Sequence, residues 1–228
     1  MSTVKYYDWS YHQARTRPNK VAVKEVSTGR ETTYGQLEER SCRLASWLQN
    51  KGVKKGDRVA ILIHNCTEVF ELEFACAKIG AIELPLNWRL TKPELEYILN
   101  DSSPEVLIYG SNFADTAKAL TKDCSIKNSL EIDDEDQNNE YEQALKENID
   151  FDVVETTHDD LIMLMYTSGT TGHPKGAMIT HEMQFYNIVN LAGSSRVTDK
   201  TVQLIVLPLF HTGGMNCYAN PILHYGGQ

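Results

Sequence analysis

The feature of this sequence that narrows its fold most is a loop rich in glycine and hydroxyl side chains between two short apolar segments. The loop, residues 166–176, reads Tyr-Thr-Ser-Gly-Thr-Thr-Gly-His-Pro-Lys-Gly. The flanking segments, 161–165 and 177–180, are typical of buried strands. Glycine lets the backbone turn tightly and approach a ligand closely, and successive backbone N–H groups in such a turn form a concavity that binds anions. The pattern therefore predicts a loop that holds a polyphosphate between two strands.

Two other interpretations of the loop are weaker. A flexible surface linker rarely lies between two core-type strands, and a linker has no use for Lys175 directly after the rigid Pro174. The phosphate loop of kinases and GTPases follows the pattern G-x-x-x-x-G-K-[ST]. Here the lysine follows proline, and Gly176 stands where that pattern needs the hydroxyl that binds the metal. The pattern therefore fails at two required positions.

The loop resembles the phosphate-loop signature of the adenylate-forming superfamily, which includes acyl-CoA synthetases, luciferases and the adenylation domains of peptide synthetases. The resemblance implies that a carboxylate attacks the α-phosphate of ATP, which gives an acyl-adenylate and pyrophosphate. The acyl group then usually passes to coenzyme A. The cofactors that the resemblance implies are therefore ATP, Mg²⁺ and coenzyme A.

The resemblance also gives roles to residues of the loop. Lys175 would neutralise the departing pyrophosphate and is one of two residues that we expect to act in catalysis. Thr167 is in addition a candidate contact for Mg²⁺, because this hard cation needs oxygen ligands and bridges phosphates. The residues expected to cradle the phosphates are Thr167, Ser168, Gly169, Thr170, Thr171 and Gly172.

A second motif, Pro-Leu-Phe-His-Thr-Gly-Gly at 208–214, follows a strand candidate at 202–207. Ligands of open α/β sheets gather beyond the carboxyl ends of strands, so His211 is well placed for a ligand. The motif also resembles one in the same superfamily, where the histidine lines the acyl and adenylate pocket. His211 is the second residue expected to act in catalysis. The resemblance further implies that Gly213, Gly214 and Met215 line the acyl tunnel.

The rest of the chain alternates strand and helix patterns, which indicates βαβ units. Capping boxes are predicted at Thr33 with Gln36 and at Thr91 with Glu94, and Asn65 is predicted to cap a third helix. The fold class we expect is α/β, with mixed, largely parallel sheets flanked by helices. By resemblance it is the first part of the large N-terminal domain of an adenylate-forming enzyme. The expected helices lie at 8–17, 33–52, 65–79, 91–100 and 181–191, and the expected strands at 21–26, 31–34, 58–63, 81–85 and 106–109.

Residues 111–157 show a less regular pattern and contain a run of acids and amides at 131–140. A metal or partner site is one interpretation of the run. A solvated loop is favoured, because like charges repel and prefer water.

Composition narrows the class of protein. Of the 228 residues, 41% are hydrophobic and 23% are charged, which is typical of a soluble globular protein. The net charge of −9 argues against a nucleic-acid partner. The chain has no signal-peptide pattern and no apolar run long enough to cross a bilayer. Because its five cysteines are scattered, we expect reduced thiols and a cytoplasmic protein. The sequence is compatible with peripheral membrane contact and with a homodimer.

The resemblance covers essentially all of the chain, but the superfamily continues beyond Gln228. We therefore expect residues 1–228 to be an incomplete AMP-binding domain, with a first region at 1–157 and a phosphate-loop and acyl-pocket region at 158–228. The adenine contacts, the acidic metal ligand and a catalytic lysine would lie further on, so this chain alone should be inactive. Trp88, Arg89 and the residues around His211 favour a fatty or aryl acid as substrate. An acyl-AMP ligase without a thioester step and a non-enzymatic nucleotide-binding module remain alternatives.

Overall fold

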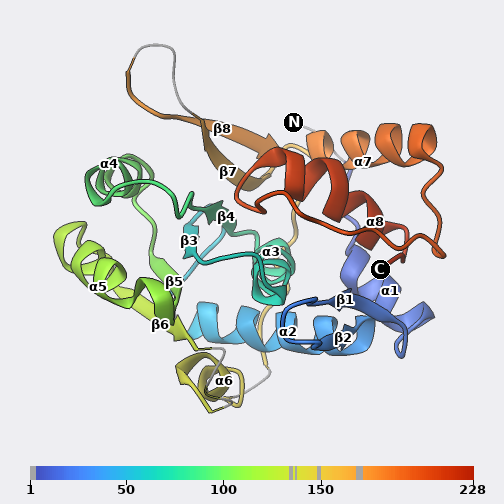
Figure 1. Ribbon diagram of the computed structural model, residues 1–228, viewed down its shortest axis with the longest axis horizontal. Helices are drawn as coiled ribbons and strands as arrows, with labels where there is room; N and C mark the ends of the chain where they lie inside the picture. Colours follow the sequence, from blue (N-terminus) through green and yellow to red (C-terminus); the bar gives the residue numbers. More distant parts are fainter. Residues whose placement is uncertain (1–3, 134–135, 137, 148–149, 168–171) are drawn as a thin grey trace.

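A six-stranded sheet with helices on both faces forms the centre of the protein (Figure 1). The computed structural model describes residues 4–133, 136, 138–147, 150–167 and 172–228. The strand order is β6-β5-β3-β4-β7-β8; the first five strands run parallel, and β8 is antiparallel to β7. The predicted mixed, largely parallel sheet is therefore confirmed. The strands are β3 (Arg58–Leu62), β4 (Ile82–Pro85), β5 (Val106–Gly110), β6 (Asn128–Ile132), β7 (Leu161–Thr167) and β8 (Lys175–Thr180).

Alternating side chains of the central strands pack into two separate hydrophobic cores. In β3, Val59 and Ile61 pack with the helices α2 (Tyr34–Asn50) and α3 (Thr67–Ile79), whereas Ala60 and Leu62 belong to a second cluster. That second cluster includes α4 (Lys92–Ser102) and α5 (Ala114–Asp123), which lie over the opposite face (Figure 1). Neighbouring side chains in a strand point to opposite faces. A strand buried on both faces is therefore apolar throughout, as β3 is after its first residue.

The two predicted capping boxes are confirmed. At the start of α2, the Thr33 hydroxyl accepts from the N–H of Gln36 at 3.2 Å, and the Gln36 amide oxygen accepts from the N–H of Thr33 at 2.9 Å. Thr91 and Glu94 form the same motif before α4. The predicted hairpin is also present, as β1 (Val21–Lys24) and β2 (Glu31–Thr33). These motifs are local in sequence, which is why the pattern could locate them.

The predicted cap of α3 is wrong. The residue at the cap position is Cys66, which makes no capping hydrogen bond with its side chain. The carboxylate of Glu25, which follows β1, takes that place instead. It accepts from the N–H of Thr67 at 3.0 Å and from the Thr67 hydroxyl at 2.8 Å. A cap that comes from a distant segment leaves Asn65 free for other partners.

Residues 111–157 are more regular than predicted. They contain η1 (Ser111–Phe113), α5, β6 and α6 (Glu140–Ala144). β6 is an edge strand with only two buried apolar side chains, Leu130 and Ile132, which explains its weak pattern. The acidic run is thus divided among β6, a connection and α6. Residues 134, 135 and 137 of that run lie outside the described residues.

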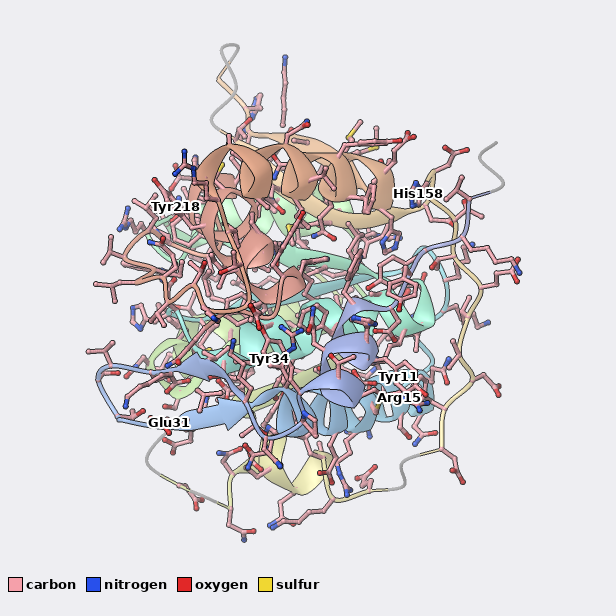
Figure 2. All side chains as sticks on the ribbon, turned by 90° about the vertical axis from the view of Figure 1, so that its right-hand side faces the viewer. Tyr11, Arg15, Glu31, Tyr34, His158 and Tyr218 are labelled. Carbon is pink, nitrogen blue, oxygen red and sulfur yellow. The ribbon has the colours of Figure 1, made fainter. Side chains whose placement is uncertain are left out.

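The amino-terminal and carboxyl-terminal segments pack together. α1 (Trp9–Thr16) contacts α8 (Asn220–His224), and the Gln13 side chain donates to the carbonyl of His224. Tyr34 begins α2, and its hydroxyl lies 2.7 Å from the carbonyl of Gly227 and 3.2 Å from that of Leu223. Figure 2 shows Tyr34 between these parts of the chain. The two other helices of the carboxyl-terminal part are α7 (His181–Ser195) and the π-helix η2 (Gly213–Ala219).

The strand predicted at 202–207 is not formed. The segment is extended, and its Val202, Leu204 and Val206 side chains are 72%, 65% and 76% exposed. Its neighbour is Gln228, whose carbonyl accepts from the N–H of Gln203 at 2.8 Å. A strand needs a ladder of backbone bonds to a neighbouring strand, and within the described part of the chain none runs along this segment. Among the described residues, no helix is long and apolar enough to span a membrane.

Candidate functional site

The β7–β8 hairpin carries the predicted phosphate loop. Thr167 is the last residue of β7 and Lys175 the first of β8, and they are register partners across the hairpin. Both are exposed, and the Thr167 hydroxyl lies 3.5 Å from the carbonyl of Lys175. Gly172 has a φ of +92°, a left-handed conformation that favours glycine. The predicted phosphate contacts Ser168, Gly169, Thr170 and Thr171 lie outside the described residues. The hairpin thus fixes where the loop leaves and rejoins the sheet.

Two aromatic contacts join this hairpin to α4. The Tyr166 hydroxyl donates to the Asp101 carboxylate at 2.5 Å, and the His173 ring stacks on Tyr97 at 5.0 Å. Burial, and then the Asp101 carboxylate, raise the pKa of Tyr166, so its hydroxyl keeps the proton that it donates. These contacts could not be predicted from local sequence patterns, because α4 and the loop are about 70 residues apart in the chain.

The predicted catalytic residue His211 lies in a tight turn. Its N–H donates to the carbonyl of Pro208 at 3.2 Å, and its carbonyl accepts from the N–H of Met215 at 3.1 Å. The ring Nδ1 accepts from the N–H of Gly213 at 3.0 Å. An imidazole nitrogen that accepts carries no proton, so a neutral His211 bears its proton on Nε2. The exposed ring can therefore offer Nε2–H to an anionic oxygen.

The residues after His211 pack closely against the chain before it. A Cβ on Gly214 would lie 2.3 Å from the carbonyl oxygen of Pro208, so a side chain does not fit there. Gly213 is half-buried, and Met215 is fully buried within the hydrophobic core. The predicted role of Gly213, Gly214 and Met215 in an acyl tunnel stays a prediction.

The turn lies beside β7. In η2, the Asn216 amide nitrogen lies 3.9 Å from the sulfur of Met165 and 3.4 Å from the hydroxyl of Thr212. Met165 is two residues before Thr167 on β7. The fold therefore brings the two predicted motifs to adjoining parts of the structure, although about 40 residues separate them in sequence.

An aromatic cluster lies past the carboxyl ends of three parallel strands. Its four rings are His64 after β3, Trp88 after β4, Phe113 after β5, and Phe210. The His64 ring centroid lies 4.7 Å from that of Trp88 and 5.0 Å from that of Phe113. Trp88 lies 6.0 Å from Phe210, and the Arg89 guanidinium lies over both rings at 4.8 Å and 5.8 Å. His64 was not among the predicted site residues. The available signal was its place directly beyond a strand, where ligands of α/β sheets gather.

Buried acids lie beneath the turn. Glu73 of α3 accepts from Gln184 at 2.6 Å and from Asn220 at 2.9 Å. Burial raises its pKa to about 7, although these two hydrogen bonds offset part of the effect. Glu83 of β4 is fully buried, and neither of its carboxyl oxygens has a hydrogen-bond partner among the described residues. Burial, and then the charge of Glu73, raise its pKa well above the usual range. Neither Glu73 nor Glu83 was among the predicted site residues.

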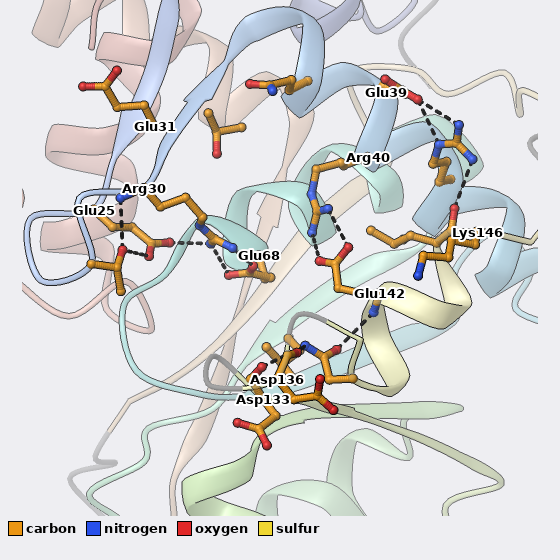
Figure 3. Close-up of a pocket in the computed structure, with 17 residues that line it drawn as sticks. Glu25, Arg30, Glu31, Glu39, Arg40, Glu68, Asp133, Asp136, Glu142 and Lys146 are labelled. Carbon is orange, nitrogen blue, oxygen red and sulfur yellow. Dashed lines mark hydrogen bonds and ion pairs between the residues drawn. The ribbon is translucent and has the colours of Figure 1, made fainter.

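A cavity of about 850 Å³ lies elsewhere and contains none of the predicted site residues. Figure 3 shows that its charged side chains mainly pair with one another. Arg30 bonds Glu68 and Glu25, and Arg40 bonds Glu142 within this cavity at 2.6 Å. Because these charges already have partners, the cavity is not the candidate site. Among the described residues, no cluster of three or more His, Cys, Asp or Glu could hold a metal ion.

The geometry is that of a β-hairpin, which carries the predicted phosphate loop, beside a histidine turn at one edge of a largely parallel sheet. The chain belongs to the AMP-binding enzyme family, whose sequence model matches residues 10–228. It therefore lies in the class of adenylate-forming enzymes that the loop sequence resembles.

Individual relatives agree with this assignment. A feruloyl-CoA synthase from Amycolatopsis sp. is 37% identical over 219 residues, which are 96% of this chain and 42% of that protein. The long-chain-fatty-acid–CoA ligase FadD13 of Mycobacterium tuberculosis strain H37Rv is 35% identical, over 93% of this chain and 42% of that protein. The structure of ATP-bound MatB from Rhodopseudomonas palustris superposes with a TM-score of 0.84 at 27% identity, over 96% of this chain and 44% of that one. The chain thus spans about two fifths of the length of these relatives.

Proposed function

We propose that this chain supplies the phosphate loop and part of the acid pocket of an acyl-CoA or aryl-CoA ligase. In a protein of the family's full length, the reaction would be attack of a carboxylate on the α-phosphate of ATP, followed by transfer of the acyl group to coenzyme A. The observation that carries the proposal is the hairpin in which Thr167 and Lys175 face each other at the two ends of the loop. The relatives named as a feruloyl-CoA synthase and as a long-chain-fatty-acid–CoA ligase support this reaction class.

In this proposal, catalysis rests on positioning and charge. Attack at the α-phosphate builds negative charge on phosphate oxygens, and groups held in place beforehand stabilise that charge most effectively. Lys175 begins a strand, so its backbone is held by the sheet while its exposed side chain can reach a pyrophosphate. His211 would offer Nε2–H to a carboxylate or phosphate oxygen from the adjoining turn.

The exposed hydroxyl of Thr167 fits a magnesium ion, because Mg²⁺ takes oxygen ligands and combines a few protein groups with substrate phosphates. The ion would neutralise phosphate charge when bound. Coenzyme A enters as the acceptor of the acyl group, and the described residues do not decide where its nucleotide lies. Fatty and aryl acids both stay within the proposal. A homodimer, peripheral membrane contact and a cytoplasmic location stay predictions.

The first test is the dependence of pyrophosphate release on the acid. We expect a protein of full family length to release pyrophosphate from ATP only when a fatty or aryl acid is present, and to form a thioester when coenzyme A is added. Release of phosphate instead of pyrophosphate would contradict adenylation. Pyrophosphate without a thioester would indicate an acyl-AMP ligase.

The second test is Lys175→Ala in the same protein. We expect kcat/KM for ATP to fall by roughly tenfold or more, since a hydrogen bond to a charged group is worth about 1.5–3 kcal/mol. The melting temperature should change little, because Lys175 is exposed and contributes little packing. Lys200→Ala is the matched control, because it removes another exposed lysine outside the loop. Equal loss of ATP use and of stability in Lys175→Ala would make this lysine structural.

A further inference from the structure

One side chain, Asn65, ties the end of β3 to the segment that precedes His211. Its Nδ2 donates to the carbonyl of Leu207 at 2.8 Å, and its Oδ1 accepts from the N–H of Leu209 at 2.9 Å. A side-chain amide that donates and accepts in this way supplies what a neighbouring strand would supply. It thus fixes the Leu207–Leu209 segment along its backbone direction.

The same segment has contacts on its other side. The carbonyl oxygens of Leu207 and Pro208 lie so close to Gly214 that a Cβ there would be 2.8 Å and 2.3 Å from them. The Leu209 side chain is buried in the core. By contrast, the preceding residues 202–206 are extended, and no strand ladder runs along them within the described part of the chain. The two hydrogen bonds of the Asn65 amide are therefore main polar contacts that fix the backbone just before the turn.

The position of the His211 ring depends on these two hydrogen bonds. His211 comes two residues after Leu209, and its N–H donates to the carbonyl of Pro208, between the two residues that Asn65 binds. A shift of this segment would move the His211 backbone and with it the ring, whose Nδ1 is already fixed by the N–H of Gly213. Small displacements of a positioned group reduce catalysis strongly.

A purely local role for Asn65 does not account for these bonds. The pattern of the sequence suggests a helix cap, but Glu25 binds both the N–H and the hydroxyl of Thr67 at the start of α3. Both polar atoms of the Asn65 amide instead reach a segment about 140 residues later in the chain.

We propose that Asn65 is a positioning residue that holds the His211 turn in the geometry used for the acid. The proposal rests on the proposed function, since it assumes that His211 faces the carboxylate. Asn65 acts through the backbone of Leu207 and Leu209 and does not itself touch the substrate. Its loss should therefore affect the acid much more than ATP.

The test compares two variants with the unaltered full-length enzyme. In Asn65→Ala we expect kcat/KM for the acid to fall about tenfold, which corresponds to about 1.4 kcal/mol. The KM for ATP should change less than about twofold. Asn65→Asp keeps an acceptor for the Leu209 N–H, but its second carboxylate oxygen would face the Leu207 carbonyl oxygen with no proton to donate, so it should not restore the acid kinetics.

Asn139→Ala is the matched control. The Asn139 side chain also donates to backbone carbonyls, of Asp133 and Asp136, and accepts from the N–H of Glu142, but it lies at the start of α6. Its loss should lower the melting temperature without a selective effect on the acid. A general loss of stability is thereby separated from a loss of positioning.

Amide hydrogen exchange at Leu209 gives a readout that needs no activity. We expect exchange of the Leu209 amide to be about tenfold faster in Asn65→Ala, the same factor as for the kinetics. An unchanged Leu209 amide in Asn65→Ala, or equal losses for acid and ATP, would overturn the proposal. If the unaltered enzyme releases no pyrophosphate with any acid, the proposed function fails instead, and Leu209 exchange still decides whether Asn65 holds the turn.

Discussion

In the His211 turn, two backbone carbonyl oxygens restrict position 214 to glycine. The carbonyl oxygens of Leu207 and Pro208 approach Gly214 so closely that there is no room for a methyl group. The π-helix η2 begins at Gly213 in the same turn, and such helices are frequent at functional sites. Gly214 does not have a positive φ, so a left-handed conformation is not the reason for a glycine at this position. The reason is the close approach of the two backbone segments.

Gly214→Ala should therefore be costly, although it adds only a methyl group. We expect the free energy of unfolding to fall by about 1–3 kcal/mol, because the backbone must shift to relieve the contact with the Pro208 carbonyl. Acid kinetics should deteriorate more than ATP kinetics. Urea unfolding and steady-state kinetics measure the two effects.

Gly193→Ala is the control for this substitution. Gly193 lies within α7, and a Cβ there meets no atom within 4 Å. Alanine should stabilise the helix by about 0.5–1 kcal/mol, since glycine is unfavourable in a helix interior. If both substitutions had the same effect on stability, the close approach at Gly214 would not matter.

At the scale of elements, a buried carboxyl group connects three helices near the site. Glu73 of α3 binds Gln184 of α7 and Asn220 of α8 through one carboxyl oxygen. Its other oxygen is buried and has no hydrogen-bond partner in the part of the chain that the structure describes. A protonated carboxyl group suits this environment, because burial disfavours the charged form. The raised pKa of Glu73, about 7, predicts how stability depends on pH.

The sign follows from the protons bound in each state. Between the usual pKa of 4.5 and the folded value of about 7, folded Glu73 holds more proton than the unfolded chain. Its contribution to stability is therefore fully present below pH 4.5 and is lost as the pH rises toward 7. Glu73→Gln stays neutral and can keep the acceptor oxygen. We expect the variant to gain on the order of 1–3 kcal/mol over the unaltered protein between pH 5 and pH 8, measured by urea unfolding.

Glu142→Gln should behave in the opposite way. Burial alone would raise the pKa of Glu142, but hydrogen bonds and the charge of Arg40 outweigh it and lower the pKa. Its contribution to stability is present above the usual pKa and is lost as the pH falls, so the cost of Glu142→Gln should be larger at pH 8 than at low pH. The same pH trend for both variants would contradict the assignment of Glu73 as a protonated acid.

At the scale of the whole molecule, the exposed segment 202–207 is the unusual feature. It presents Val202, Leu204 and Val206 to solvent beside a hollow of about 450 Å³ lined in part by Val23, Phe70 and Ile222. A continuous apolar surface with unpaired backbone promotes association.

We expect the 228-residue chain to associate in a concentration-dependent way and to show no acid-dependent exchange between ATP and pyrophosphate. Leu204→Lys should reduce association by placing a charge in the apolar surface, as sedimentation or light scattering would show. Val153→Lys changes another exposed valine outside this segment and serves as the control. Equal effects of both substitutions would show that the segment has no special part in association. Exchange at the rate of a full-length relative would show that 228 residues suffice for catalysis.

Much of the fold could be predicted because it depends on local or periodic features. Strands β3 and β5 are largely continuous apolar runs, and the capping boxes join residues three apart. The predicted phosphate loop is a contiguous motif between two strands. Each of these signals lies within a few residues of the chain. The family could be predicted for the same reason, since the motif that carries it is contiguous.

Only the tertiary structure decided which distant groups meet. It gave the cap of α3 to Glu25, gave Asn65 to the His211 turn, and placed Glu73 between α7 and α8. It also left the apolar segment 202–207 without a strand partner among the described residues. The sequence determined which segments can become strands and helices through local propensity and periodicity. The partners of buried polar groups and of strand edges depend on contacts across 40 to 140 residues, on which local pattern carries no information.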